Sequence, residues 1–259
     1  MKIRLFGSCS GTEPVPGRHH TAFAVERRGG LYWFDAGESC AHTAHLSGAD
    51  LLSIRHIVIS HTHMDHIGGL AHLLWTMRKL DGHAHRLDGQ TVFLHLPDLR
   101  AWDAVSSLLA LTEGGFSCRF VIRPGLIGDG PLFEDNGLAV LALHTRHLPH
   151  AEGEPWRSFG FSIEADGKKI VYTGDTKGYE DYAPLLDGCD VLLHETGHHH
   201  PAEVAKRLID EGRAPGLLAF LHHGRDILNH PDEQKALLAA IPDLSWRILN
   251  DGDVIEMGE

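Results

Sequence analysis

The segment 60–66, with the sequence SHTHMDH, constrains this chain more than any other feature. It follows the compact, β-branched run 54–60, which has the composition of a buried strand. An apolar run with helical spacing begins at Gly68, so the histidines occupy a strand-to-helix loop in which Gly68 and Gly69 allow close backbone approach. Zinc accepts nitrogen and oxygen donors at about 2.0–2.2 Å. A cluster this tight therefore predicts a site for two adjacent metal ions.

The remainder of the chain favours a single α/β domain over residues 1–259, built on mixed sheets. Short apolar runs alternate with glycine-rich turns, and no low-complexity linker separates two parts. The expected strands are 2–6, 21–26, 31–34, 54–60, 92–96, 116–122, 139–143, 158–164, 169–173, 191–194, 217–221, 246–249 and 254–257, and the expected helices are 68–77, 99–111, 202–211 and 231–240.

Composition narrows the class of function. Lys and Arg number 23 against 35 Asp and Glu, a net charge of −12 that disfavours general nucleic-acid binding, because phosphate contacts need clustered cations. The 22 histidines make metal chemistry the first hypothesis. Four scattered cysteines without a CxxC pair, and no apolar run long enough to cross a membrane, predict a soluble protein of a reducing compartment, the cytoplasm.

Further candidate ligands follow other predicted strands. Asp175 stands in the segment YTGDT, and aspartate beside glycine is also common as a turn cap. His147 has His144 and His150 as neighbours that could replace it, and His223 competes with His222. A lone histidine is more often a structural hydrogen-bonding residue than a ligand. Because these residues recur at strand ends, the prediction that they bind metal is stronger for the group than for any one of them.

Together these residues carry a resemblance. HTHMDH with a later strand-end histidine, a GDT aspartate and an LHH histidine resembles the metallo-β-lactamase superfamily. The segments 7–18 (GSCSGTEPVPGR), 34–38 (FDAGE) and 194–205 are similar to the ribonuclease Z branch, and the resemblance runs from about residue 3 to residue 225. It implies an αββα sandwich of two mixed sheets flanked by helices.

The resemblance also implies a ligand set for two divalent ions. Zinc is the first expectation, although manganese and iron accept the same donors. Asp175 would bridge the two ions. His144 or His150 could take the place of His147 as a ligand, and His222 could take the place of His223. One ion would be bound by His61, His63 and His147, and the other by Asp65, His66 and His223.

Catalytic roles follow from the same likeness. A hydroxide held between the ions would attack phosphorus, and Asp65 would both bind metal and orient this nucleophile. Glu195 and His198 match a Glu–His pair that protonates the leaving group, with His199 and His200 as alternatives to His198. The carboxylates of Asp35 and Glu38 are candidates for orienting the ligand imidazoles.

The sequence departs from that branch in one segment that bears on the substrate. It lacks a flexible basic Gly/Pro-rich arm, since residues 78–90 are only mildly basic and short. The expected substrate is therefore a small or cyclic nucleotide-like diester or an RNA 3′ end. A carbon-ester or lactone hydrolase is disfavoured because an HTPGHT-type segment is absent, and a metal-binding protein without turnover is a third reading. A homodimer is a family-level expectation.

Overall fold

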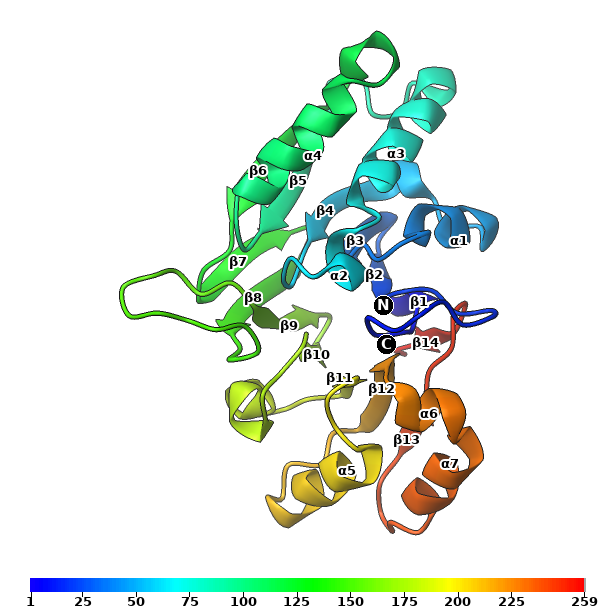
Figure 1. Cartoon of the computed structure of the whole chain (residues 1–259), viewed down its shortest axis with the longest axis vertical. Helices are drawn as coiled ribbons and strands as arrows, with labels where there is room; N and C mark the ends of the chain where they lie inside the picture. Colours follow the sequence, from blue (N-terminus) through cyan, green and yellow to red (C-terminus); the bar gives the residue numbers. More distant parts are fainter. Residues whose placement is uncertain (259) are drawn as a thin grey trace. The chain divides into compact units, whose positions relative to one another are not determined.

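The computed structural model describes residues Met1–Gly258 and divides into two compact units (Figure 1). Each unit is built on one seven-stranded mixed sheet. Unit 1 comprises Met1–Gly7, His19–Ile127 and Asp251–Gly258, and unit 2 comprises Ser8–Arg18 and Gly128–Asn250.

The sheet of unit 1 has the order β14-β1-β2-β3-β4-β5-β6. Pairings from β14 to β3 are antiparallel and those from β3 to β6 are parallel. The strands are β1 (Lys2–Gly7), β2 (Ala22–Arg27), β3 (Gly30–Phe34), β4 (Ile54–Val58), β5 (Thr91–Leu96), β6 (Val121–Leu126) and β14 (Val254–Glu256), and the helices are α1 (Cys40–Leu46), α2 (Met64–Ile67), α3 (Leu70–Ala84) and α4 (Arg100–Ala110), with 3-10 turns at Leu51–Ser53 and Glu113–Phe116.

The sheet of unit 2 repeats this plan in the order β13-β12-β11-β10-β9-β8-β7. Pairings from β7 to β10 are antiparallel and those from β10 to β13 are parallel. The strands are β7 (Gly130–Asp135), β8 (Leu138–His144), β9 (Phe159–Ala165), β10 (Lys168–Tyr172), β11 (Val191–Thr196), β12 (Leu217–His223) and β13 (Trp246–Ile248), and the helices are α5 (Pro201–Asp210), α6 (Arg225–Asn229) and α7 (Pro231–Ala239), with 3-10 turns at Tyr179–Asp181 and Ala183–Leu185.

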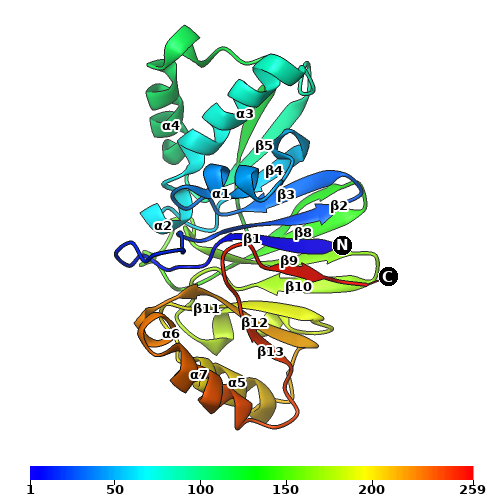
Figure 2. The same ribbon diagram turned by 90° about the vertical axis from the view of Figure 1, so that its right-hand side faces the viewer.

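Helices cover one face of each sheet (Figure 2). In unit 1, α3 buries Leu70, Leu73, Leu74 and Met77, a spacing that keeps them on one side of the helix, against the sheet core around Trp33. In unit 2 the residues Val204, Ala205 and Leu208 of α5 pack with Leu192, Leu218 and Phe220 of the sheet. The mixed α/β architecture expected from the sequence is confirmed.

One expected strand is wrong. The run 116–122 was expected to be extended, but Gly114 and Gly115 have φ values of 69° and 60° and Phe116 has a φ of 56°. Left-handed residues end the 3-10 turn, and β6 begins only at Val121. The strand β7 and the helix α1 were not expected from the sequence. Within residues 1–258, no helix combines the length and hydropathy needed to cross a membrane.

Acid should weaken unit 1 through His95. Burial lowers the pKa of His95 from 6.5 to about 4, and its Nε2 lies 2.9 Å from Nδ1 of His56. The unfolded chain takes up this proton near pH 6.5 and the folded unit resists it, so the stability contributed by neutral His95 falls as the pH drops from 7 toward 4. We expect His95→Gln to reduce the loss of unfolding free energy between pH 7 and pH 5 by roughly 1–2 kcal/mol.

The measurement is urea unfolding at both pH values. His42→Gln, which replaces an exposed histidine of α1, serves as the control and should keep the wild-type pH profile. An unchanged profile in His95→Gln would show that burial of this ring does not govern the acid response.

Candidate metal centre

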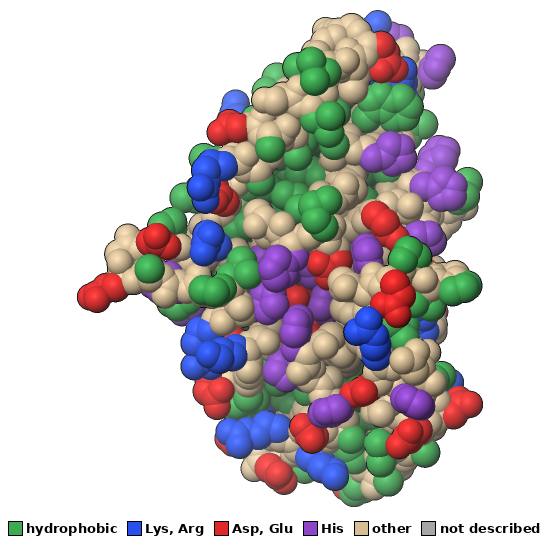
Figure 3. Space-filling model, viewed as in Figure 1, with side chains coloured by type: hydrophobic (Ala, Val, Ile, Leu, Met, Phe, Trp, Pro, Cys, Tyr) green, Lys and Arg blue, Asp and Glu red, His purple; other side chains and the backbone are tan. Residues whose placement is uncertain are grey.

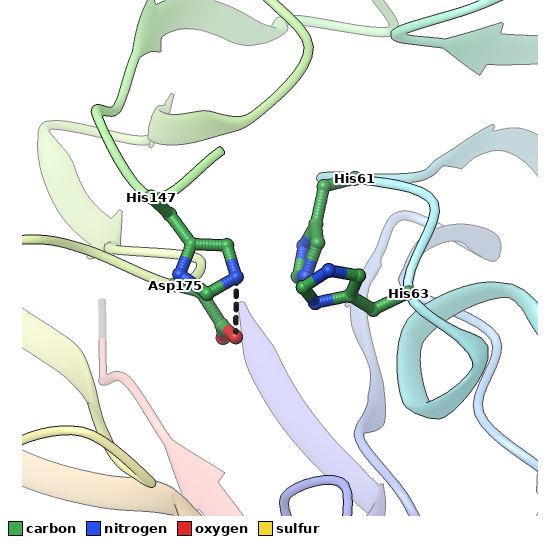
Figure 4. A group of neighbouring side chains, drawn as sticks. All are labelled: His61, His63, His147 and Asp175. Carbon is green, nitrogen blue, oxygen red and sulfur yellow. Dashed lines mark ion pairs between the residues drawn. The ribbon is translucent and has the colours of Figure 1, made fainter. Parts of the chain in front are cut away.

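In unit 1 the segment 60–66 follows β4 as the sequence predicts, but the expected loop is shorter, because residues 64–66 already lie in α2. Helix α2 begins at Met64 with His63 at its N-cap, and this turn directs the side chains of the segment together. The His61 ring centroid lies 4.6 Å from that of His63 and 4.1 Å from that of His66. His61 and His66 are fully buried, whereas His63 is exposed. Figure 4 shows the His61 and His63 imidazoles side by side on this loop.

Asp35 orients the histidine that ends the motif. Its side chain is fully buried just after β3, and it accepts hydrogen bonds from the backbone N–H and the hydroxyl of Ser60 at 2.7 and 2.8 Å. His66 Nδ1 lies 2.8 Å from Asp35 Oδ2, so Nδ1–H donates and Nε2 keeps its lone pair, 3.5 Å from Asp65 Oδ2. Asp35 thus orients a candidate ligand as expected, whereas Glu38 instead accepts the backbone N–H of His20.

The expected close backbone approach is found at Gly69. A Cβ placed there would lie 2.1 Å from the carbonyl oxygen of Gly37. The Gly69 N–H donates to the carbonyl of Ala36 at 2.7 Å, which ties the start of α3 to the turn after Asp35. Glycine is therefore required for the histidine loop and the Asp35 turn to meet.

In unit 2, Asp175 is the centre of a second group of donors. It is 2% exposed, and its two oxygens face different imidazoles: Oδ1 lies 3.3 Å from His222 Nε2, and Oδ2 lies 3.5 Å from His147 Nε2. Figure 4 shows His147 directed at this carboxylate. A carboxylate that presents each oxygen to a separate histidine has the arrangement needed to bridge two cations.

Glu195 is the second buried carboxylate of this unit. It accepts the backbone N–H groups of Thr176 and His198 at 3.1 and 2.9 Å, and His198 Nδ1 lies 3.0 Å from Oε1. Burial would raise the pKa of Glu195, but the hydrogen bond from His198 and the nearby ring of His222, whose Nδ1 lies 3.6 Å from Oε2, outweigh it and hold that pKa below its usual value. The same bond to Glu195 raises the pKa of His198. The pair therefore favours a protonated, partly exposed imidazole beside an ionised carboxylate.

The other two histidines of the triplet are directed elsewhere. His199 Nε2 lies 2.8 Å from the hydroxyl of Thr176, and His200 Nδ1 lies 2.5 Å from Asp226 on α6. Of the three, His198 alone is held by both oxygens of Glu195.

A similar distinction separates His147 from its neighbours. His144 Nδ1 donates to Asp129 at 2.7 Å and His150 Nε2 donates to the carbonyl of Glu154 at 2.8 Å. Both rings stack on Trp156. His147 is the member of this set that reaches Asp175.

The geometry favours His222 over His223, the histidine preferred from the sequence. The Nε2 of His223 lies 2.7 Å from the carbonyl of Leu249, and its Nδ1 lies 3.0 Å from the hydroxyl of Thr196. Burial, with a smaller contribution from nearby Arg18, lowers the pKa of this ring to about 3. Both nitrogens are engaged in hydrogen bonds that fix the end of β12, so His223 serves the fold. His222 is the neighbour that reaches Asp175 and Glu195.

A bulge accounts for the different directions of the two rings. Alternation along a regular strand puts adjacent side chains on opposite faces, but the register of β12 against β11 shifts between Glu195 and Thr196. His222 has a φ of 50°, which turns its ring toward the carboxylates. Gly197 leaves the necessary space, since a Cβ there would lie 2.7 Å from the His222 ring. The pair of adjacent histidines was visible in the sequence, but the bulge that selects between them was not.

The donor set fits divalent cations. In unit 2 one ligand atom from each of Asp175, Glu195, His198 and His222 lies within 4.8 Å of the others. Imidazole nitrogens and carboxylate oxygens are the donors that zinc, manganese and iron share. Two carboxylates almost fully removed from water also need positive charge nearby, which a bound cation would supply.

Known proteins resemble this chain in sequence and fold. Residues 32–241 match the family model described as the β-lactamase superfamily domain. A ribonuclease Z of Pyrococcus abyssi is 36% identical over 85% of this chain and 85% of its own length. The short-form human tRNase Z superposes with a TM-score of 0.75 and 22% identity over 100% of both chains. The metallo-β-lactamase fold protein YhfI of Bacillus subtilis gives 0.75 and 17% over 98% of both.

These similarities confirm the fold expected from the motifs, a metallo-β-lactamase sandwich of two mixed sheets flanked by helices. Hydrolases of this fold use a dinuclear site of divalent cations, and the histidine and aspartate groups described above are the candidates to hold it. The chain belongs to the β-lactamase superfamily, as a ribonuclease Z-like, metal-dependent phosphoric diester hydrolase.

Proposed function

We propose that this protein hydrolyses a small or cyclic nucleotide-like phosphodiester, or the 3′ end of a short RNA. The observation that carries the proposal is the pairing in unit 2 of Asp175, whose two oxygens face different histidines, with the Glu195–His198 pair. Relatives named ribonuclease Z support an RNA or nucleotide substrate. The net charge of −12 favours a short substrate over general nucleic-acid binding.

We propose metal ligands in each unit. This ligand set keeps the motif residues of unit 1 and replaces His223 by His222. Zinc is the proposed metal, because imidazole and carboxylate donors suit it. In unit 1 the ligands would be His61, His63, Asp65 and His66, and in unit 2 they would be His147, Asp175 and His222.

The chemistry divides between the metal and the chain. When bound, two divalent cations supply an activated water and offset the negative charge that develops on the phosphoryl oxygens. Asp65 would orient the attacking water. His198, held by Glu195, would donate the proton that the departing oxygen needs, a task suited to an imidazole whose pKa is raised. We further propose that the protein is cytoplasmic. We also propose that it forms a homodimer, and analytical sedimentation would test this oligomeric state.

Removing the Asp175 carboxylate tests the metal centre directly. We expect Asp175→Ala to lose bound metal and to slow bis(p-nitrophenyl) phosphate hydrolysis by at least about 100-fold. Elemental analysis and turnover are measured on one preparation, with Asp210→Ala, an exposed carboxylate at the end of α5, as control. Full metal content and an undiminished rate in Asp175→Ala would contradict the centre. If the wild-type protein hydrolyses a lactone but no phosphodiester, its substrate is a carbon ester and the proposed function is wrong.

Adjacent substitutions in β12 test the choice between its two histidines. His222→Gln should lower the metal content and the rate by about 10- to 100-fold with little change in thermal unfolding. His223→Gln should leave the metal content unchanged and lower the unfolding temperature, since one of its buried hydrogen bonds is lost. The reverse pattern would restore His223 as the ligand.

The leaving group tests His198. Because p-nitrophenolate departs without a proton, His198→Ala should affect that substrate by less than about 10-fold. A diester with an alkoxide leaving group should slow by about 10²–10⁴-fold. Equal losses on both substrates would show that His198 does not act as the acid. His230→Ala, an exposed histidine of unit 2, is the control.

A further inference from the structure

The connection between β8 and β9, residues 145–158, carries an aromatic stack that the proposed metal centre does not use. We refer to this segment as the β8–β9 arm. The Trp156 ring lies 4.0 Å from the ring of His144 with an interplanar angle of 10°. It lies 3.8 Å from the ring of His150 with an angle of 15°. Three rings thus stack in nearly parallel planes at the root of the arm.

Hydrogen bonds fix the arm and its rings. At its base Thr145 N–H donates to the carbonyl of Ser158 at 2.8 Å, and the Ser158 hydroxyl donates to the carbonyl of Thr145 at 2.9 Å. His150 is held by the carbonyl of Glu154 and His144 by Asp129, as described above. Arg157 donates to the carbonyl of Pro149 at 3.1 Å and closes the arm further out. Because these rings are already held in place, binding a ligand to them costs the protein little side-chain entropy.

The stack lies close to a proposed ligand along the chain. His147, which reaches Asp175, is three residues from His150, so their Cα atoms are at most about 11 Å apart. A single nucleotide spans a comparable distance between its phosphate and the far edge of its base. A diester whose phosphate is held beside His147 can therefore bring its base to the stack.

The surface of the arm favours one base over a long strand. His150 is exposed and Trp156 is half-buried, so the stack has aromatic surface open to solvent. The arm extends away from the sheet (Figure 1), and its tip carries the exposed carboxylates Glu152 and Glu154. In the space-filling view (Figure 3), acidic side chains lie on the projection at the left of the molecule. These charges repel the sugar–phosphate backbone of a longer nucleic-acid strand that would continue across the tip.

We propose that the His144–Trp156–His150 stack binds one nucleobase of the substrate by stacking and so selects diesters that carry a base next to the cleaved phosphate. Every base has an aromatic face, so the platform would tolerate different bases and strengthen binding by about 5- to 150-fold over a base-free ligand. The inference rests on the proposed function for the position of the phosphate.

The experiment compares two probes, adenosine 5′-monophosphate and ribose 5-phosphate, by calorimetry with the metal-loaded full chain. The two share the sugar and the phosphate and differ only in the base. We expect the nucleotide to bind about 5- to 150-fold more tightly. A wild-type protein that binds the nucleotide no more tightly than the sugar phosphate, including one that binds neither, overturns the platform.

Variants then locate the preference. His150→Ala and Trp156→Ala should each reduce the affinity ratio toward one and leave the affinity for ribose 5-phosphate unchanged. His150→Phe, which restores a ring, should retain the preference, and His230→Ala should keep the wild-type ratio. Thermal unfolding checks that each variant is folded. A wild-type ratio in both alanine variants overturns the assignment.

The two proposals fail in different ways. If the nucleotide binds preferentially through His150 but no phosphodiester is hydrolysed, the platform stands and the proposed function falls. If diesters with and without a base are hydrolysed with the same kcat/KM and bind equally, the function stands and the platform falls.

Discussion

The chemistry of each unit depends on one fully buried carboxylate, Asp35 in unit 1 and Glu195 in unit 2. A carboxylate in that environment is tolerated only when donors surround it. Asp35 accepts from a backbone N–H, a hydroxyl and the ring of His66. Glu195 accepts from two backbone N–H groups and the ring of His198. Satisfying each charge fixes one imidazole, so the requirement that stabilises the fold also orients the reactive groups.

The repeated sheet plan explains where these groups gather. In each unit three antiparallel pairings are followed by three parallel ones. Parallel strands end at the same edge of a sheet, so the segments that follow them lie together. The histidine loop follows β4, and the Glu195 and His222 segments close β11 and β12. Distant parts of the chain are thereby brought to one edge within each unit.

Local features of the chain could be predicted from the sequence, whereas features that depend on irregular backbone could not. The motif at 60–66 and the two mixed sheets were predictable, because a β-branched strand, a dense histidine loop and a helix each have a characteristic local sequence pattern. The choice between His222 and His223 was not, because the directions of their rings depend on a bulge and a positive φ in β12. The stack on Trp156 was also hidden, since it joins residues across a turn whose geometry no periodicity describes.

The bulge in β12 and the β8–β9 arm differ in how they would respond to insertions and deletions. Removing one residue near His222 would restore the regular pleat and exchange the faces of the two adjacent histidines, so a ring that now fixes the fold would turn toward Asp175. The arm is closed at its base by Thr145 and Ser158, so its tip can change length without moving either strand. A change in length at the arm tip would therefore leave both strands in place, whereas a change in the length of β12 would exchange the faces of its two histidines.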